Sequence, residues 1–169
     1  KVMALSRKQP AVRNAILGIS WFWFVGTVLS AQLPTYAVVN LGGSQSLYLF
    51  AFVLFSIGTG VGSLMCEKLS GRTVEIGLVP LGAIGMSVFA IDLYFASRGL
   101  AAPQAIFTLA QFVAVPGHWR VMADLALLSL FAGLYSVPMY ALIQMRSQPT
   151  HRARIIAANN ILNALFMIA

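Results

Sequence analysis

Charged residues are scarce in this chain. Only 9% of its 169 residues are Asp, Glu, Lys or Arg, whereas a water-soluble domain carries about 25%. Hydrophobic residues make up 59% of the chain, and its mean hydropathy is +0.84. This composition excludes an ordinary water-soluble domain and indicates a membrane protein, because segments that face lipid must be almost free of charge.

Acidic residues are the rarest of the charged groups. Four acids stand against 11 Lys and Arg, which gives a formal net charge of +7. A nucleic-acid-binding protein would gather its basic residues on one polar, folded surface. Here they lie only between long apolar runs, as in the inner loops of a membrane protein. Binding to nucleic acid is therefore not expected.

Cysteine and histidine are almost absent. The single cysteine, Cys66, allows no disulfide within the chain, and the two histidines, His118 and His151, fall in different loops. No Cys/His metal site can be assembled from them, and no cofactor is expected. His118 and Asp124 resemble the His-x4-Asp pair of glycerolipid acyltransferases, but five residues separate them here. We therefore expect no catalytic site in this segment.

Five apolar runs predict five transmembrane helices, because about 20 apolar residues suffice to cross a bilayer as a helix. The expected fold class is thus an all-α membrane protein, preceded by a basic lead-in, 1–14. Since the sequence ends within an apolar run, we expect it to be a piece of a longer protein. The predicted spans are about 15–31 (with an extension to 39 allowed), 47–66, 76–96, 121–144 and 155–169, the last one truncated.

The longest loop, 97–120, contains a shorter apolar stretch. Gln104–Ala114 has only 11 residues, too few to cross a bilayer, and is bounded by Pro103 and Pro116. We expect an interfacial or re-entrant helix there.

The distribution of Lys and Arg predicts the orientation. With the N-terminus inside, the inner segments 1–14, 67–75 and 145–154 hold nine of these residues, and the outer segments 32–46 and 97–120 hold two. Lys and Arg concentrate in short loops on the cytoplasmic side of membrane proteins. A cytoplasmic N-terminus with five spans is the prediction.

Two glycines in the second span, Gly58 and Gly62, lie one helical turn apart. They present a strip of small residues against which another helix can pack closely. A phosphate-binding loop is the alternative, but it would need a preceding strand and a following Lys-Ser/Thr, and neither is present. We expect helix packing.

Two acids, Asp92 and Asp124, are predicted near the outer boundary of their spans. Arg98 and Arg120 are close to them in the sequence. An ionisable residue within a span is costly and by default marks either a pathway or a helix contact. We favour ion pairs at the outer surface over a coupling-ion role, because a proton-relay carboxylate would fit better at mid-depth.

Polar residues form two further stripes within the spans. The fifth span carries three amides on one side, which either hydrogen-bond to another helix or line a wet cavity; both alternatives stay open. A second stripe lies on the fourth span and would allow the two to face one another across a pathway. The candidate cavity residues are Asn159, Asn160 and Asn163 in the fifth span, and Tyr135, Ser136, Tyr140 and Gln144 in the fourth.

The charged turn after the second span resembles the signature loop of the major facilitator superfamily. In both, a glycine and a short apolar stretch precede an acid, a base and then Gly-Arg. This chain has one additional residue between Lys68 and Gly71, and Thr73 replaces the second base, which suits the degenerate copy after the eighth span. The residues assigned to this loop and its gate are Gly62, Glu67, Lys68, Gly71, Arg72 and Glu75.

Four neighbouring segments carry a more specific resemblance. They are SWFWFVG (20–26), EKLSGRTVEIGLVPLGAIG (67–85), PGHWRV (116–121) and ALIQMRSQPTHRARIIAANNILNALFM (141–167). Together they are similar to the transporter portion of bacterial proteins of the lysophospholipid transporter type. In many of these, the transporter is fused to a glycerophospholipid acyltransferase and an acyl-ligase module.

This resemblance implies spans seven to eleven of a twelve-span transporter of the bacterial inner membrane. The implied substrates are lysophospholipids, such as lyso-phosphatidylethanolamine, which are moved inward for re-acylation. Glu67, Gly71 and Arg72 would then brace the inner gate. The implied partners are membrane lipids and the remaining spans of the same protein, with a fused acyltransferase in the subgroup. Two alternatives stay open: an exporter of drugs or small metabolites, and a membrane anchor for such an acyltransferase.

Overall fold

The computed structural model describes residues 10–71, 76–98, 100 and 106–169. These parts of the chain are helical, apart from turns and one isolated β-bridge between Gly43 and Phe107. The elements in chain order are α2 (Pro10–Thr35), the π-helix η1 (Tyr36–Asn40), α3 (Gln45–Leu69), α4 (Leu78–Arg98), α5 (Leu109–Ala114), the 3-10 helix η2 (Pro116–His118), α6 (Trp119–Arg146) and α7 (Arg152–Met167).

Four helical stretches of the described chain are long and apolar enough to cross a membrane. The prediction of an all-α protein of membrane type is therefore confirmed. The fifth predicted span falls on α7, which has 16 residues, fewer than the roughly 20 that a crossing needs; that span stays a prediction, as does the facilitator fold. The four stretches are Pro10–Asn40, Gln45–Leu69, Leu78–Arg98 and Pro116–Arg146.

The first helix starts earlier than predicted, and its far end agrees with the extension to 39 that the prediction allowed. It begins at Pro10 rather than near Ala15, because the first position of a helix needs no N–H donor and suits proline. Beyond Pro34 the chain continues as the π-helix η1 to Asn40. Proline cannot donate a backbone hydrogen bond within a helix, which disturbs the regular turn around it.

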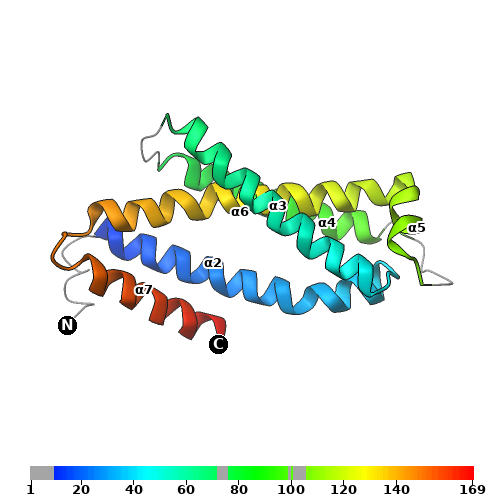
Figure 1. Ribbon diagram of the computed structural model, residues 1–169, viewed down its shortest axis with the longest axis horizontal. Coiled ribbons are helices and arrows are strands. Elements are labelled where there is room, and N and C mark those ends of the chain that lie inside the picture. Colours follow the sequence, from blue (N-terminus) through cyan, green and yellow to red (C-terminus); the bar gives the residue numbers. More distant parts are fainter. Residues whose placement is uncertain (1–9, 72–75, 99, 101–105) are drawn as a thin grey trace.

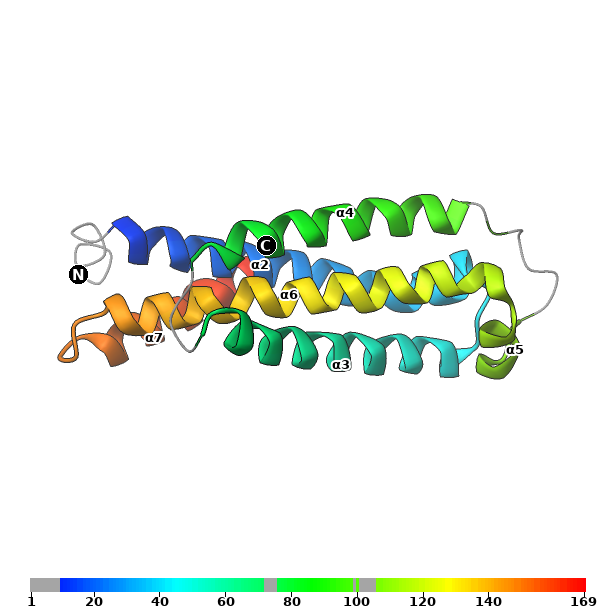
Figure 2. The same cartoon turned by 90° about the horizontal axis from the view of Figure 1, so that it is seen from above.

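Helix α6 lies at the centre of the bundle. Figure 2 shows α3 and α4 on its two opposite sides, and Figure 1 shows α2 beneath it, with α7 on the far side of α2. The N-terminal end of α2 and the turn between α6 and α7 lie at one end of the molecule. Helix α5 lies at the other, which we call the outer end after the predicted orientation.

Glycines let α3 and α4 approach α6 closely. A Cβ atom added to Gly62 would lie 2.0 Å from the carbonyl oxygen of Leu130, and one added to Gly58 would lie 1.9 Å from Ser129 Oγ. On the opposite side of α6, a Cβ at Gly82 would lie 2.7 Å from a backbone nitrogen of that helix. These approaches exclude any side chain, so the helix packing predicted for the Gly58–Gly62 strip is present.

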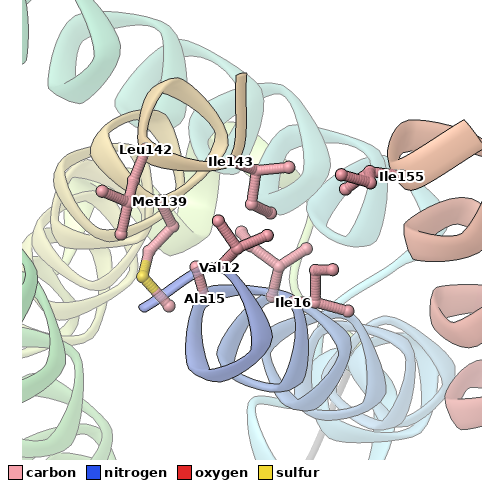
Figure 3. Packing of buried hydrophobic residues seen from close by; sticks show 8 residues of the cluster. Val12, Ala15, Ile16, Met139, Leu142, Ile143 and Ile155 are labelled. Atoms are coloured by element: carbon pink, nitrogen blue, oxygen red, sulfur yellow. The ribbon is translucent and has the colours of Figure 1, made fainter. Parts of the chain in front are cut away.

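Two apolar clusters fill the bundle. The inner cluster joins α2, α6 and α7, and Figure 3 shows side chains of α2 pointing toward those of α6, with Ile155 of α7 beside them. The outer cluster joins α3, α4, α5 and α6 with the segment after α2. The inner cluster consists of Val12, Ala15, Ile16, Ile19, Met139, Leu142, Ile143 and Ile155, and the outer cluster of Leu41, Leu47, Ala51, Ala96, Phe112, Val121 and Leu125.

The loop before α6 forms a cap on the outer end. Within the stretch predicted as an interfacial or re-entrant helix, the structure has the six-residue α5, which begins after a capping box formed by Thr108 and Gln111. The N–H of Phe107 donates to Gly42 O at 2.8 Å and ties this loop to the turn before α3. His118 stacks on Phe112 and is buried, which gives this histidine a packing role.

Matched alanine substitutions test the α3–α6 contact. Gly62→Ala should lower the free energy of unfolding by about 1–3 kcal/mol, because the added methyl group has no room. Gly60→Ala, where nothing lies within 4 Å, should be neutral or stabilising by up to about 1 kcal/mol, because alanine favours helix. Thermal unfolding in detergent measures both. Equal effects of the two substitutions would contradict the close contact.

Cysteine labelling tests the orientation. In a Cys66→Ala background, Ser46→Cys should react with an impermeant maleimide added to intact spheroplasts, because Ser46 is exposed at the outer end. Gln148→Cys, exposed in the turn between α6 and α7, should react only after the membrane is opened. The opposite pattern would reverse the predicted orientation.

Candidate functional site

The predicted signature loop begins on the last turns of α3. Gly62 is buried against α6, whereas Glu67 and Lys68 lie on the exposed face of the last turn. Arg72 and Glu75, which the resemblance assigns to the same gate, lie outside the described residues. The described part of the loop lines a surface depression formed by Leu64, Glu67, Lys68 and Gly71.

Gly71 ends α3. Its φ angle of 56° is in the left-handed region, which strongly favours glycine. Just before it, the Ser70 N–H donates to Cys66 O at 3.0 Å, and the Gly71 N–H donates to Lys68 O at 3.4 Å. Gly71, the first residue of the predicted Gly-Arg pair, thus lies at a sharp turn of the chain just after the end of the helix.

The three amides of α7 have different surroundings. Asn163 is buried, and its Oδ1 accepts a 2.9 Å hydrogen bond from Ser20 Oγ on α2. Asn159 is only 2% exposed, and its Oδ1 has no hydrogen-bond partner among the described residues. Asn160 is exposed on the adjacent face. Asn163 therefore lies in the contact between α7 and α2, and Asn159 is buried one turn before it on the same face of α7.

The polar stripe of α6 also meets α2. Tyr135 donates its hydroxyl to Gly18 O at 3.2 Å, and Tyr140 accepts a 2.6 Å hydrogen bond from Trp23 Nε1. Ser136 is buried and bonds within its own helix, where its Oγ donates to Gly133 O at 3.5 Å. Gln144, at the inner end of the stripe, is exposed.

Helix α2 thus lies between α6 and α7, the helices that carry the two predicted stripes, as Figure 1 shows. It presents Ser20 to α7 and Trp23 to α6. The sequence pattern does not pair Ser20 and Trp23 with the stripes, because spacing within one helix does not indicate which helix becomes its neighbour. The available signal was Ser20, a polar residue within the apolar first span, at the start of the segment Ser20–Gly26.

At the outer end, an ion pair joins α4 to α6. Arg120 Nε donates to Asp92 Oδ2 at 3.1 Å, and a second guanidinium nitrogen contacts the other carboxylate oxygen. The pair therefore has the two-pronged geometry that favours arginine. Arg98, the nearer arginine in the sequence, lies over the ring of Tyr94 at 4.7 Å. Asp124 is buried, and its Oδ2 has no hydrogen-bond partner within the described ranges.

Apolar clefts border α2 where it diverges from its neighbours. One, of about 260 Å³, lies between α2, α4 and α6, and another, of about 160 Å³, also involves α3. Leu29 and Leu128 line both clefts. Trp21 and Tyr135 lie at the first cleft, and Tyr36 lies at the second, so each has an amphipathic aromatic side chain at its margin.

Because comparisons with known proteins give no match, a functional assignment rests on the residues described above. No model of a protein family, no curated protein and no solved structure matches the chain. The facilitator resemblance therefore stays a prediction.

A double-mutant cycle tests the contact between α2 and α7. Ser20→Ala should lower the free energy of unfolding by about 0.6–1.7 kcal/mol, because it removes a hydrogen bond in a membrane-type interior. In an Asn163→Leu background the same change should have almost no effect. Ser30→Ala, at an exposed position of the same helix, is the control. Additive effects of Ser20→Ala and Asn163→Leu would show that the two side chains are not coupled.

Proposed function

We propose that this chain is part of a carrier of the major facilitator type that moves lysophospholipids, such as lyso-phosphatidylethanolamine, across a bacterial inner membrane for re-acylation. The resemblance of the 62–72 loop and of the flanking segments supports this proposal. Four candidate spans are part of the framework that such a carrier needs. The other half of the transporter and the remaining spans would be its partners, with a fused acyltransferase in the subgroup.

The observation that carries the proposal is the pair of apolar clefts beside α2. A lysophospholipid has one acyl chain and one polar head group, so its path needs an apolar channel with polar groups at the margin. The clefts have aliphatic walls, represented by Leu29 and Leu128, and are bordered by Tyr135 and Tyr36. Small-molecule sites in proteins combine mostly apolar walls with a few polar groups in this way.

The contacts of α2 suit a helix that moves relative to its neighbours. Its N-terminal half packs in the inner cluster against α6 and α7, while its outer half borders the clefts. In facilitator-type carriers, two halves rock about a site near the middle of the membrane. The gate residues that the resemblance assigns, Glu67, Gly71 and Arg72, would act at the inner end of α3.

A matched pair of tryptophan substitutions on α2 tests the clefts. Leu29→Trp should reduce uptake of lyso-phosphatidylethanolamine by the full-length protein in proteoliposomes by roughly tenfold, because filling an apolar site costs about 1–3 kcal/mol. Leu17→Trp should leave uptake unchanged. The two leucines are similarly exposed, at 42% and 47%, but Leu17 lines neither cleft.

The same assay separates the alternatives. Competition by lysophospholipids but not by hydrophobic cations is expected. The reverse order of competition would favour an exporter of drugs or small metabolites. Lipid movement that vanishes when only the soluble acyltransferase module is deleted would instead favour a membrane anchor. Equal uptake by the Leu29→Trp and Leu17→Trp proteins would remove the clefts from the path.

A further inference from the structure

The outer end of α6 holds a carboxyl group in an unusual environment. Asp124 is only 3% exposed, and its Oδ2 has no hydrogen-bond partner among the described residues. Its neighbours along the helix, Val121 and Leu125, belong to the outer apolar cluster. A carboxylate in such a place would lose its hydration without gaining donors in return, which strongly favours the neutral, protonated form.

A second carboxyl group lies on the same side of α6 as Asp124. Arg120, one helical turn before Asp124, bonds to Asp92 of α4, so the contact between α4 and α6 brings the two acids together. Ionised carboxylates only accept hydrogen bonds, so two of them can be joined only when one carries a proton. Neighbouring like charges also repel, and carboxyl pairs in proteins relieve the repulsion by sharing one proton.

Arg120 does not neutralise both acids. Its guanidinium group is engaged with both oxygens of Asp92 across the contact between α4 and α6. One positive charge therefore faces two carboxyl groups. If both were ionised, the cluster would keep one net negative charge at the edge of an apolar core.

Arg98, the arginine at the outer end of α4, lies over the ring of Tyr94, and no ion pair joins it to Asp92 or Asp124 among the described residues. Tyr36 of η1 is the titratable side chain that this element brings near Asp124, and its hydroxyl bonds with Ser97 of α4. His118, in η2, bonds through Nδ1 to the carbonyl of Phe112 at 2.9 Å. Within the described part of α3, the charged residues Glu67 and Lys68 lie at the opposite, inner end of the helix.

We propose that Asp92 and Asp124 form a binding site for a single proton, which Asp124 carries and shares with Asp92. With Arg120 the site then contains one guanidinium cation, one carboxylate and one neutral carboxyl group, so its net charge is zero. The proton acts as a bridge between α4 and α6 at the outer end. Its loss places two negative charges side by side in this contact and weakens it, whatever substrate the protein moves.

Infrared spectroscopy of the full-length protein in lipid nanodiscs tests the site directly. A protonated carboxyl group has a C=O stretching band that is separate from the carboxylate bands. The native protein should show this band at neutral pH and lose it as the pH is raised. Asp124→Asn should remove the band. Asp92→Asn should remove it too, because Arg120 is then free to pair with an ionised Asp124.

Glu67→Gln is the matched spectroscopic control, since it removes a carboxyl group from the exposed inner end of α3, and it should leave the band in place. Absence of the band from the native protein at neutral pH, or its persistence in Asp124→Asn, would overturn the proposal. Absence of the band together with a sodium-dependent gain in thermal stability would also overturn it, by assigning the cluster to a metal cation.

The pH dependence of stability provides a second readout that distinguishes the proton site from an ordinary ion pair. Asparagine imitates the neutral carboxyl group, so Asp124→Asn should unfold at the same temperature as the native protein at neutral pH. It should also lack the decline that the native protein shows at alkaline pH. A variant that is destabilised equally at every pH would show that Asp124 acts only through its charge, against the proposal.

Discussion

The structure depends on the close approach of two helices to opposite sides of α6. Lipid tails are as apolar as the side chains that face them, so apolar burial alone does little to hold helices together in a membrane. Dense packing of small residues replaces it, with Gly58 and Gly62 on one side of α6 and Gly82 on the other. This contact fixes the positions of both acids: Asp124 lies on α6 itself, and Asp92 faces it from α4.

Polar contacts then give the bundle its specificity. Ser20 and Trp23 of α2 bond to α7 and α6 respectively, and Asp92 and Arg120 join α4 to α6. In an apolar interior these polar groups have few alternative hydrogen-bond partners. Each bond therefore favours one rotation of a helix about its axis over others. The apolar clefts lie beside α2, which neither glycine packing nor a polar side-chain contact joins to α3 or α4 among the described residues.

Much of this arrangement could be predicted from the sequence because it follows from local composition. Apolar runs of about 20 residues predict the four candidate spans, and the spacing of Gly58 and Gly62 predicts a packing strip. The start of the first helix at Pro10 was not predicted, because the basic residues of 1–14 indicated a lead-in that precedes the first span. The partners of the polar residues depend on which helices become neighbours, and no local pattern encodes that. The bond from Ser20 to Asn163 spans 143 residues, and the Asp92–Arg120 pair joins two different helices.

The central place of α6 has a consequence for biogenesis. Helices α3 and α4 are consecutive in the chain, yet each packs mainly on α6 rather than on the other. Chains are synthesised from the N-terminus at about 5–20 residues per second, so both helices enter the membrane before their principal partner exists. The glycine-containing faces of α3 and α4 therefore contact lipid until α6 inserts between them. The last of these three helices to be made therefore sets the moment at which the bundle can assemble.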